Sequence, residues 1–245
     1  MNLHSVGIVT ALAAEARTLT HQPVRPGQLI VLGEGCGLWL SGMGPDAARE
    51  AALALVKAGA TALAVFGVAG ALAPGVRNGT LLCPACVIDE RGNDYLPAPA
   101  WSAELQQRLA AASLPIMTGG SLLSLPAPLL TATEKMAMRQ RHMAVAVDME
   151  SAAVAAVATE RGLPFVVLRA IIDEHDDDIP GALHAGIDEW GRPRALHMLA
   201  LLVRHPGLVA RLPGLSSRMH SATRALRAAV TVLGVSMGRA VQGRC

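Results

Sequence analysis

Apolar runs of strand length alternate with segments of helical spacing along most of the chain. Strands are predicted over 5–12, 61–74, 79–90 and 163–172, and two short strands around a glycine turn over 29–44. Helices are predicted from 13, over 45–59 and over 101–113, and a strand, turn and helix over 144–162. This alternation is typical of an α/β sandwich with a mostly parallel central sheet.

One uncharged window, residues 58–76, is long enough to span a bilayer. It contains four glycines and Pro74, and alanine is the commonest of its remaining residues. A buried strand followed by a glycine-rich turn is therefore the favoured interpretation. The first residues lack a basic stretch and carry Glu15 and Arg17 early, which argues against a secretory signal. We expect a cytoplasmic protein.

Charge is distributed unevenly, although the formal net charge is only +2. Residues 1–190 contain 12 basic and 19 acidic residues, whereas 191–245 contain nine arginines and no acidic residue. The shift predicts one folded domain over 1–190 and a basic helical C-terminal extension over 191–245, with helices at 195–204 and 219–233.

The helix predicted over 219–233 is amphipathic. Its apolar face contains Met219, Ala222, Leu226, Val230 and Leu233, and its arginines lie mostly opposite. An arginine-rich amphipathic helix is a candidate for peripheral contact with an anionic membrane, here the inner membrane. The alternatives are a helix docked on the domain and a disordered basic end.

Cys83 and Cys86 form a C-P-A-C sequence with the spacing of a thioredoxin-like redox motif. That chemistry needs the first cysteine at a helix N-terminus. The surrounding residues predict instead a strand interrupted at Pro84, so buried, unreactive thiols are the favoured interpretation.

Three carboxylates occupy unusual positions in this pattern. Glu15 and Glu150 lie at strand-to-helix junctions, and Asp173 follows the strand 163–172. Ligands of parallel α/β sheets bind beyond the carboxyl ends of the strands, so these acids are candidates for one cleft. The alternative for each acid alone is a carboxylate at a helix terminus that accepts backbone N–H groups.

The segment "DEHDDD" (173–178) places five acids and a histidine in six consecutive positions. A metal-dependent hydrolase is one interpretation, but metal ligands usually come from several pre-oriented segments. We predict no metal, and a solvated rim loop from Glu174 to Asp178. His175 is a neighbour that could tune Asp173.

Two glycine-rich turns are candidates for substrate contact. "SGMGPDA" opens the helix 45–59, so the N–H groups around Gly42 could hold an anion or a sugar oxygen. "FGVAGALAPG" places Gly67 and Val68 at the end of a buried strand. Neither matches a P-loop or a dinucleotide fingerprint, and no cofactor is predicted.

Four stretches together resemble the superfamily of purine nucleoside phosphorylases and methylthioadenosine/S-adenosylhomocysteine nucleosidases: "GIVTALAAEA", "FGVAGALAPGVRNGTLL", "VDMESAAVAAVA" and "FVVLRAIID". The chain, with its arginine-rich end, is similar to the hopanoid-associated phosphorylase branch. The resemblance implies a three-layer α/β/α sandwich with a mixed, mostly parallel sheet. It also implies a catalytic domain over 1–190 that cleaves a purine–ribose N-glycosidic bond.

The resemblance further implies roles for single residues. Departing adenine must be protonated by a carboxylic acid with a raised pKa, and Asp173 matches this acid. Glu150 matches the carboxylate that binds the ribose hydroxyls, and Met149 matches the residue packed on the sugar face. Glu15 matches the acid that orients and deprotonates the attacking water. Arg169 is expected near the nucleophile.

The sequence departs from the superfamily pattern at several positions. Val68 replaces a frequent serine, Ile172 replaces the polar residue before the acid, and no aromatic near Pro126 can stack on adenine. Val68 and Ile172 are still expected to contact substrate. Glu15 in place of an arginine leaves a phosphate site incomplete, because an acid repels phosphate and activates water. Hydrolysis is favoured, with phosphate as the alternative co-substrate.

The hopanoid branch implies a 5′-substituted adenosine with a lipid-like group, such as adenosylhopane. The alternative is soluble methylthioadenosine or S-adenosylhomocysteine. A nucleic-acid binder is an alternative of another class, but the chain beyond residue 190 has no aromatic residue for stacking on bases. The resemblance also implies a homodimer or a higher homo-oligomer.

Overall fold

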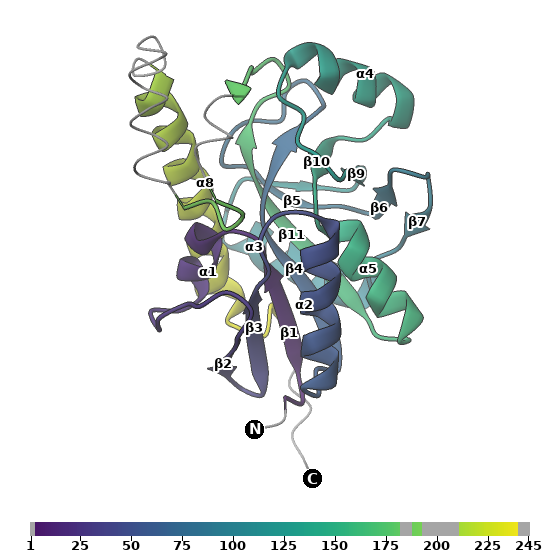
Figure 1. Ribbon diagram of the computed structural model, residues 1–245, viewed down its shortest axis with the longest axis vertical. Coiled ribbons are helices and arrows are strands. Elements are labelled where there is room, and N and C mark those ends of the chain that lie inside the picture. The colour runs from purple at the N-terminus through teal and green to yellow at the C-terminus, as the bar shows by residue number, and fades with distance from the viewer. Residues whose placement is uncertain (1–2, 182–187, 193–210, 240–245) are drawn as a thin grey trace.

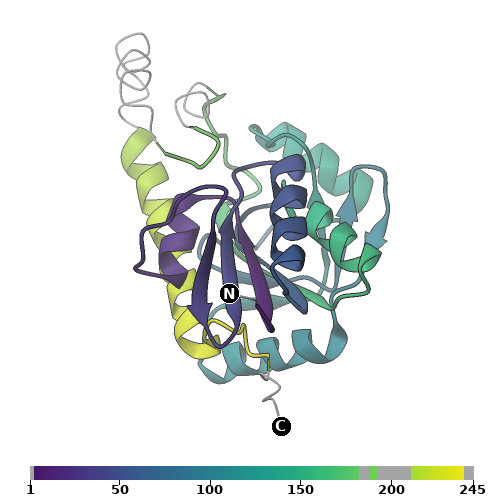
Figure 2. The same ribbon diagram turned by 60° about the horizontal axis from the view of Figure 1, so that its bottom comes forward.

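A computed structural model describes residues 3–181, 188–192 and 211–239. Its strands form one mixed sheet with helices on both faces (Figure 1, Figure 2). The strands are β1 (Val6–Thr10), β2 (Leu29–Gly33), β3 (Cys36–Leu40), β4 (Ala62–Ala71), β5 (Leu81–Cys83), β6 (Cys86–Asp89), β7 (Asp94–Tyr95), β8 (Ile116–Thr118), β9 (Ser121–Ser124), β10 (Ala146–Asp148) and β11 (Phe165–Asp173). The helices are α1 (Ala13–Leu19), α2 (Pro45–Lys57), α3 (Pro99–Ala111), α4 (Ala132–His142), α5 (Ser151–Glu160) and α8 (Leu212–Leu233).

The pairing of the strands confirms the predicted fold class. Six pairs are parallel, namely β1–β3, β1–β4, β4–β11, β5–β8, β6–β9 and β9–β10. Four are antiparallel, namely β2–β3, β4–β10, β5–β11 and β6–β7. The result is a mixed, mostly parallel sheet between helical layers, as the resemblance implied.

The sheet separates two hydrophobic cores. One lies beneath α2 and α5, and the other lies beneath α1, α3 and α8. The facing residues of α2 and α5 are largely small, since Ala48, Ala51 and Ala155 are completely buried. Pro45 occupies the first turn of α2, where its missing N–H costs no hydrogen bond. Alanine-rich packing of this kind explains how a chain with 2% aromatic residues forms a dense core.

The predicted strand 61–74 is β4. The window 58–76 is therefore part of the sheet, and the membrane-span alternative is wrong. Among the helices of the described ranges, none has the length and apolarity required to cross a bilayer. The predicted strand 79–90 is in fact two strands, β5 and β6, which pair with different neighbours. Pro84 and Ala85 form the break between them.

The C-P-A-C cysteines lie at this break. Cys83 ends β5, Cys86 begins β6, and neither is at a helix N-terminus. Burial raises the pKa of the Cys83 thiol to about 12 and also raises the pKa of Cys86. Both thiols therefore stay protonated at neutral pH, as expected for unreactive packing residues.

The helix predicted over 219–233 is the C-terminal part of α8, which begins at Leu212 and packs beside α1 and α3 (Figure 1). Its apolar face is covered by the domain, because Ala222, Leu226, Ala229 and Leu233 belong to the second core. Of the three interpretations, the docked helix is therefore correct, and this apolar face cannot enter a membrane. Membrane contact stays a prediction that depends on the basic side chains of the extension and not on this apolar face. The helix predicted over 195–204 lies outside the described residues, and the boundary at 190 stays a prediction.

Candidate active site

The site lies where β4 exchanges one neighbour for another. β1 pairs with residues 62–65 of β4, whereas β10 pairs with Gly70 and Ala71 in the antiparallel direction. β1 and β10 therefore lie along the same edge of β4, and their carboxyl ends point toward its middle from opposite directions. β11 runs along the other edge of β4 and ends beside Gly70. A position where strands diverge in this way is the usual ligand site of an α/β sheet.

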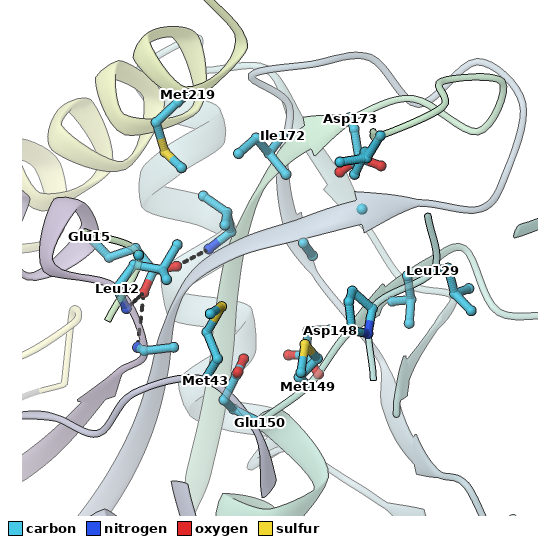
Figure 3. A pocket seen from close by; sticks show the side chains of 18 of the residues that line it. Leu12, Glu15, Met43, Leu129, Asp148, Met149, Glu150, Ile172, Asp173 and Met219 are labelled. Carbon is cyan, nitrogen blue, oxygen red and sulfur yellow. Dashed lines mark hydrogen bonds between the residues drawn. The ribbon is translucent and has the colours of Figure 1, made fainter. Parts of the chain in front are cut away.

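A cavity of about 340 Å³ occupies this position (Figure 3). Its volume lies within the range of small-molecule sites. The wall is mainly apolar and is built from the turn after β1, the end of β4, the segment before α4, the start of α5, the end of β11 and the helix α8. The ionisable side chains on the wall are Glu15, Lys135, Asp148, Glu150, Asp173 and Arg218.

Glu15 is held on the wall by three backbone N–H groups. Ala11 and Leu12 donate to Oε2 at 3.0 and 2.8 Å, and Val68 donates to Oε1 at 2.8 Å. The helix-terminus alternative is thus partly correct, because two of these donors precede α1. The residue is 1% exposed, and burial raises its pKa from 4.5 to about 7, against the opposing effect of Arg169. A carboxylate with this pKa can exchange a proton at neutral pH.

Arg169 lies beneath the cavity and binds two carboxylates. Its Nε donates to Asp148 Oδ2 at 2.8 Å, and its Nη2 donates to Glu150 Oε2 at 3.0 Å. Burial would lower its pKa, but the charges of Asp148, Glu150 and Glu15 raise it instead. The guanidinium is thus a fixed counter-charge for the acids of the site.

Asp148 is oriented by two serines. Ser124 Oγ donates to its Oδ1 at 2.5 Å, and Ser151 Oγ donates to its Oδ2. The backbone N–H of Ser151 donates to Oδ1 at 3.2 Å. These bonds join β9, β10 and the start of α5, and they set the direction in which Asp148 meets Arg169.

Glu150 is the N-cap residue of α5, but its side chain makes no capping hydrogen bond to that helix. Its Oε1 accepts the backbone N–H of Gly44 at 3.0 Å, so the carboxylate occupies the N-terminus of the neighbouring helix α2. Burial raises the pKa of Glu150, and Arg169 opposes that rise. The glycine turn expected to cradle an anion therefore already binds a side chain of the protein.

Asp173 reaches the cavity because β11 contains an irregularity. Ile171 pairs with Ala69 and Asp173 pairs with Gly70, which leaves Ile172 as an extra residue. Successive strand residues normally point to opposite faces, but a bulge changes this alternation. Ile172 and Asp173 consequently both line the cavity (Figure 3).

Lys135, in the first turn of α4, forms a buried ion pair with Asp173. The lysine Nζ donates to Asp173 Oδ2, to the carbonyl of Glu174 at 2.7 Å and to the carbonyl of Asp177 at 3.1 Å. Burial raises the pKa of Asp173, and the Lys135 ammonium acts in the opposite direction. Lys135 therefore connects α4 to the end of β11 and to the loop that follows this strand.

The acidic run 173–178 is divided among separate partners. Asp177 accepts hydrogen bonds from Arg218 and from the backbone of Glu174, while Asp178 accepts the backbone N–H of Ala132. His175 Nδ1 lies 3.5 Å from Asp176 Oδ1, and this histidine forms no hydrogen bond or ion pair with Asp173. Across the described segments, no three potential ligands come together as a metal site.

The structure places most of the predicted substrate residues on the cavity wall. Besides the three acids, Val68, Met149 and Ile172 line it. Gly67 lies behind the wall, where a Cβ would approach Arg169 Nη1 to 2.6 Å and would overlap Glu15. Gly42 lies against Trp190 and does not line the cavity, so the predicted contact from this glycine is not direct.

Several wall residues were not predicted from the sequence. Lys135 and Asp148 carry charge, and Met43, Leu215 and Met219 extend the apolar surface. The start of α4 could have been predicted from the sequence, because Thr131 and Glu134 form a capping box. Lys135 is the residue that follows Glu134. No local sequence pattern indicates that α8 contributes to the cavity wall. Its wall residues are about 200 positions away in the sequence from Leu12 and Glu15, which they meet only in the folded protein.

Fold and site together define an α/β enzyme with the nucleoside phosphorylase-like architecture. A profile of the Phosphorylase superfamily matches residues 6–205. The chain therefore belongs to this superfamily, whose enzymes cleave N-glycosidic bonds.

Solved structures with the same fold include two enzymes from Helicobacter pylori. The 5′-methylthioadenosine/S-adenosyl homocysteine nucleosidase is 18% identical, with a TM-score of 0.65 over 94% of this chain and 99% of that chain. Native futalosine hydrolase is also 18% identical, with a TM-score of 0.65 over 94% and 98%.

The S-adenosylhomocysteine nucleosidase of Streptococcus pyogenes is 21% identical, with a TM-score of 0.61 over 71% of this chain and 86% of that chain. At these identities the likeness establishes the fold. A search among curated proteins gave no match.

Proposed function

We propose that this enzyme hydrolyses the N-glycosidic bond of a 5′-substituted adenosine and releases adenine. The observation that carries the proposal is the state of Glu15, a buried carboxylate on the cavity wall with a pKa of about 7. A carboxylate of this kind activates water and repels phosphate. The proposed roles of the other site residues follow from their positions around it.

Asp173 is proposed as the acid that protonates the departing base. Burial raises its pKa, as a general acid requires, and it lies at the end of β11 opposite the Glu15 side of the cavity (Figure 3). Among the described residues, the neighbouring wall contains Ala127, Pro128 and Leu129 but no aromatic side chain. Apolar contact rather than aromatic stacking would then hold the base.

Glu150 and Met149 are proposed to bind the ribose. Among the described residues, Glu150 Oε1 accepts one hydrogen bond, from the Gly44 N–H, and Oε2 accepts one, from Arg169 Nη2, each at 3.0 Å. Each oxygen therefore retains a lone pair for a sugar hydroxyl. The carboxylate charge also favours a ribosyl group that becomes cationic as the bond breaks.

Water rather than phosphate is proposed as the nucleophile. Every cationic side chain that lines or supports the described cavity has a carboxylate partner: Arg169 has Asp148 and Glu150, Lys135 has Asp173, and Arg218 has Asp177. Phosphate would have to displace one of these pairs. Water needs only the proton acceptor that Glu15 provides.

The 5′ substituent is proposed to be apolar. Leu12, Met43, Ile172, Leu215 and Met219 supply hydrocarbon and thioether surface around the site. The resemblance to the hopanoid-associated branch makes adenosylhopane our preferred substrate. Methylthioadenosine remains the alternative, because two fold relatives are nucleosidases named for it or for S-adenosylhomocysteine.

Base release tests the proposal directly. Purified enzyme is incubated with methylthioadenosine, S-adenosylhomocysteine and an adenosine bearing a long 5′-alkyl chain, each with and without phosphate. Adenine and the sugar product are then separated by chromatography. We expect free adenine and an unphosphorylated sugar, with the highest kcat/KM for the alkyl substrate.

The possible results separate the parts of the proposal. A sugar 1-phosphate that forms only with phosphate would contradict hydrolysis, and a preference for methylthioadenosine would contradict the lipid-like substituent. No adenine from any of the three substrates would refute the proposal as a whole. The cytoplasmic location, the homo-oligomer and the absence of nucleic-acid binding stay predictions.

A further inference from the structure

Lys135 is the single buried residue of α4, and its side chain is about 1% exposed. An ammonium group carries three protons. All three are directed to oxygen atoms, one to the Asp173 carboxylate and two to backbone carbonyls. A buried lysine with this arrangement needs an explanation, because a buried ion pair usually stabilises a fold no better than apolar packing does.

The two oxygens of Asp173 have different surroundings. Oδ2 accepts the Lys135 hydrogen bond, whereas no described residue donates to Oδ1. Asp173 lines the cavity, so the carboxylate contacts the lysine on one side and the substrate space on the other. In the ion pair an ammonium proton of Lys135 is directed at the carboxylate, so this lysine is a source from which Asp173 can be protonated.

We propose that Lys135 supplies, through Asp173, the proton that the departing base takes up. The inference rests on the proposed function. Lys135 Nζ first passes a proton to Asp173 and becomes a neutral amine. As the C1′–N bond then breaks, its electron pair passes to the base, which takes that proton from Asp173. The pair is left as a carboxylate and a neutral amine.

The proton balance closes through water. The attacking water loses one proton to Glu15, the base gains one from the Lys135–Asp173 pair, and solvent exchange restores both sites. Lys135 has no contact with the base in this scheme. It acts through Asp173 and is a positioning residue that also stores the proton.

Other charges near the pair are engaged elsewhere. Arg218 of α8 binds Asp177, and Arg77, which follows β4, binds Glu174. His175 faces Asp176 on the rim. Among the described residues, Lys135 is therefore the cation in direct contact with Asp173.

The chain contains only two lysines, Lys57 and Lys135, which provides a matched control. Lys57 is exposed at the end of α2. We would measure kcat and KM for adenine release from pH 5 to 10 in the wild type and in Lys135→Met, Lys135→Arg and Lys57→Met. Thermal unfolding of each variant shows whether it is folded.

The two Lys135 variants separate proton supply from charge. Arginine keeps the charge but does not lose its proton, so Lys135→Arg should lower kcat about 100-fold at all pH values with little change in KM. Methionine leaves a solitary buried carboxyl that carries its own proton at low pH. Lys135→Met should therefore remain active in acid, with the alkaline limb moved at least about one pH unit lower.

A purely structural or electrostatic role predicts the opposite order. Arginine would then be the better replacement, and methionine would lower kcat equally at every pH. Either result would overturn the proposal. Lys57→Met should match the wild type throughout.

Nuclear magnetic resonance gives a test that needs no variant to fold. Protein labelled with ¹³C at lysine Cε should show two signals, one for each lysine. We expect the wild-type kcat to be retained only where the Lys135 signal is that of the charged ammonium. Full activity while Lys135 is neutral would overturn the inference. Failure of the proposed function would appear differently, as no adenine release by the wild type.

Discussion

Replacement of Glu15 by glutamine should make the protein more stable at alkaline pH, relative to the wild type. Burial raises the Glu15 pKa from 4.5 to about 7, so the folded state holds a proton that the unfolded chain releases. Each pKa unit corresponds to about 1.4 kcal/mol, which makes this rise worth about 3 kcal/mol of unfolding free energy.

The sign follows from the proton count. Below pH 4.5 both states carry the proton, and the stabilisation by the neutral carboxyl is fully present. As the pH rises toward about 7 the unfolded state is favoured increasingly, and above that value the loss is complete. Glutamine cannot ionise, so Glu15→Gln lacks this loss. Its amide resembles the protonated acid in shape, and any mismatch with the Val68 N–H adds only a constant offset.

The assay is thermal unfolding of both proteins at intervals from pH 4.5 to 9. For a domain of this size, about 3 kcal/mol corresponds to a relative change in Tm of about 6 to 12 °C between the two ends of that range. An exposed acid, Glu50 on α2, provides the control variant Glu50→Gln.

The pH dependence of activity must have the same midpoint as the pH dependence of stability. If Glu15 activates water, kcat/KM of the wild type should rise with pH through about 7, as Glu15 loses its proton. Glu15→Gln should lower kcat by about 100-fold or more. Parallel stability curves for Glu15→Gln and the wild type, or an acidic limb far from the stability midpoint, would refute the assignment.

Three further predictions concern the buried charges. Arg169→Met should destabilise the fold by about 3 to 5 kcal/mol in urea unfolding, because it leaves Asp148 and Glu150 without their cation. Asp173→Asn should lower kcat about 100-fold or more and also destabilise the fold, since Lys135 stays buried; adding Lys135→Met should restore stability but not activity. Gly67→Ala should lower kcat with a smaller effect on Tm, because its Cβ would displace the Glu15 carboxylate; wild-type rates for this variant would contradict the close approach.

The three acids could be predicted because their positions depend on local sequence. Each follows a buried strand, and strand ends of an α/β sheet converge by construction. The sequence did not indicate how they would be held. The Arg169 network depends on Asp148, whose direction is set by Ser124 and Ser151 from two other elements.

That Lys135 belongs to the site was not predicted from the sequence, and the reason is different. The helix α4 has almost no apolar face, so hydrophobic periodicity gives little signal over 132–142. Its capping box was readable, but nothing local indicates that one lysine of a polar helix turns inward. The bulge that turns Asp173 toward the cavity is likewise invisible, because it arises from the pairing of β11 with β4.

The site contains more acid than base, and this excess bears on the reaction. Glu15, Asp148, Glu150 and Asp173 surround a mainly apolar cavity, while Arg169 and Lys135 are their buried cations. Full ionisation would leave two uncompensated negative charges in a poorly solvated space, which burial opposes. The raised pKa values of Glu15, Glu150 and Asp173 express this cost. A ribosyl group that becomes cationic would supply the missing positive charge, so the environment that penalises the resting carboxylates would stabilise the transition state.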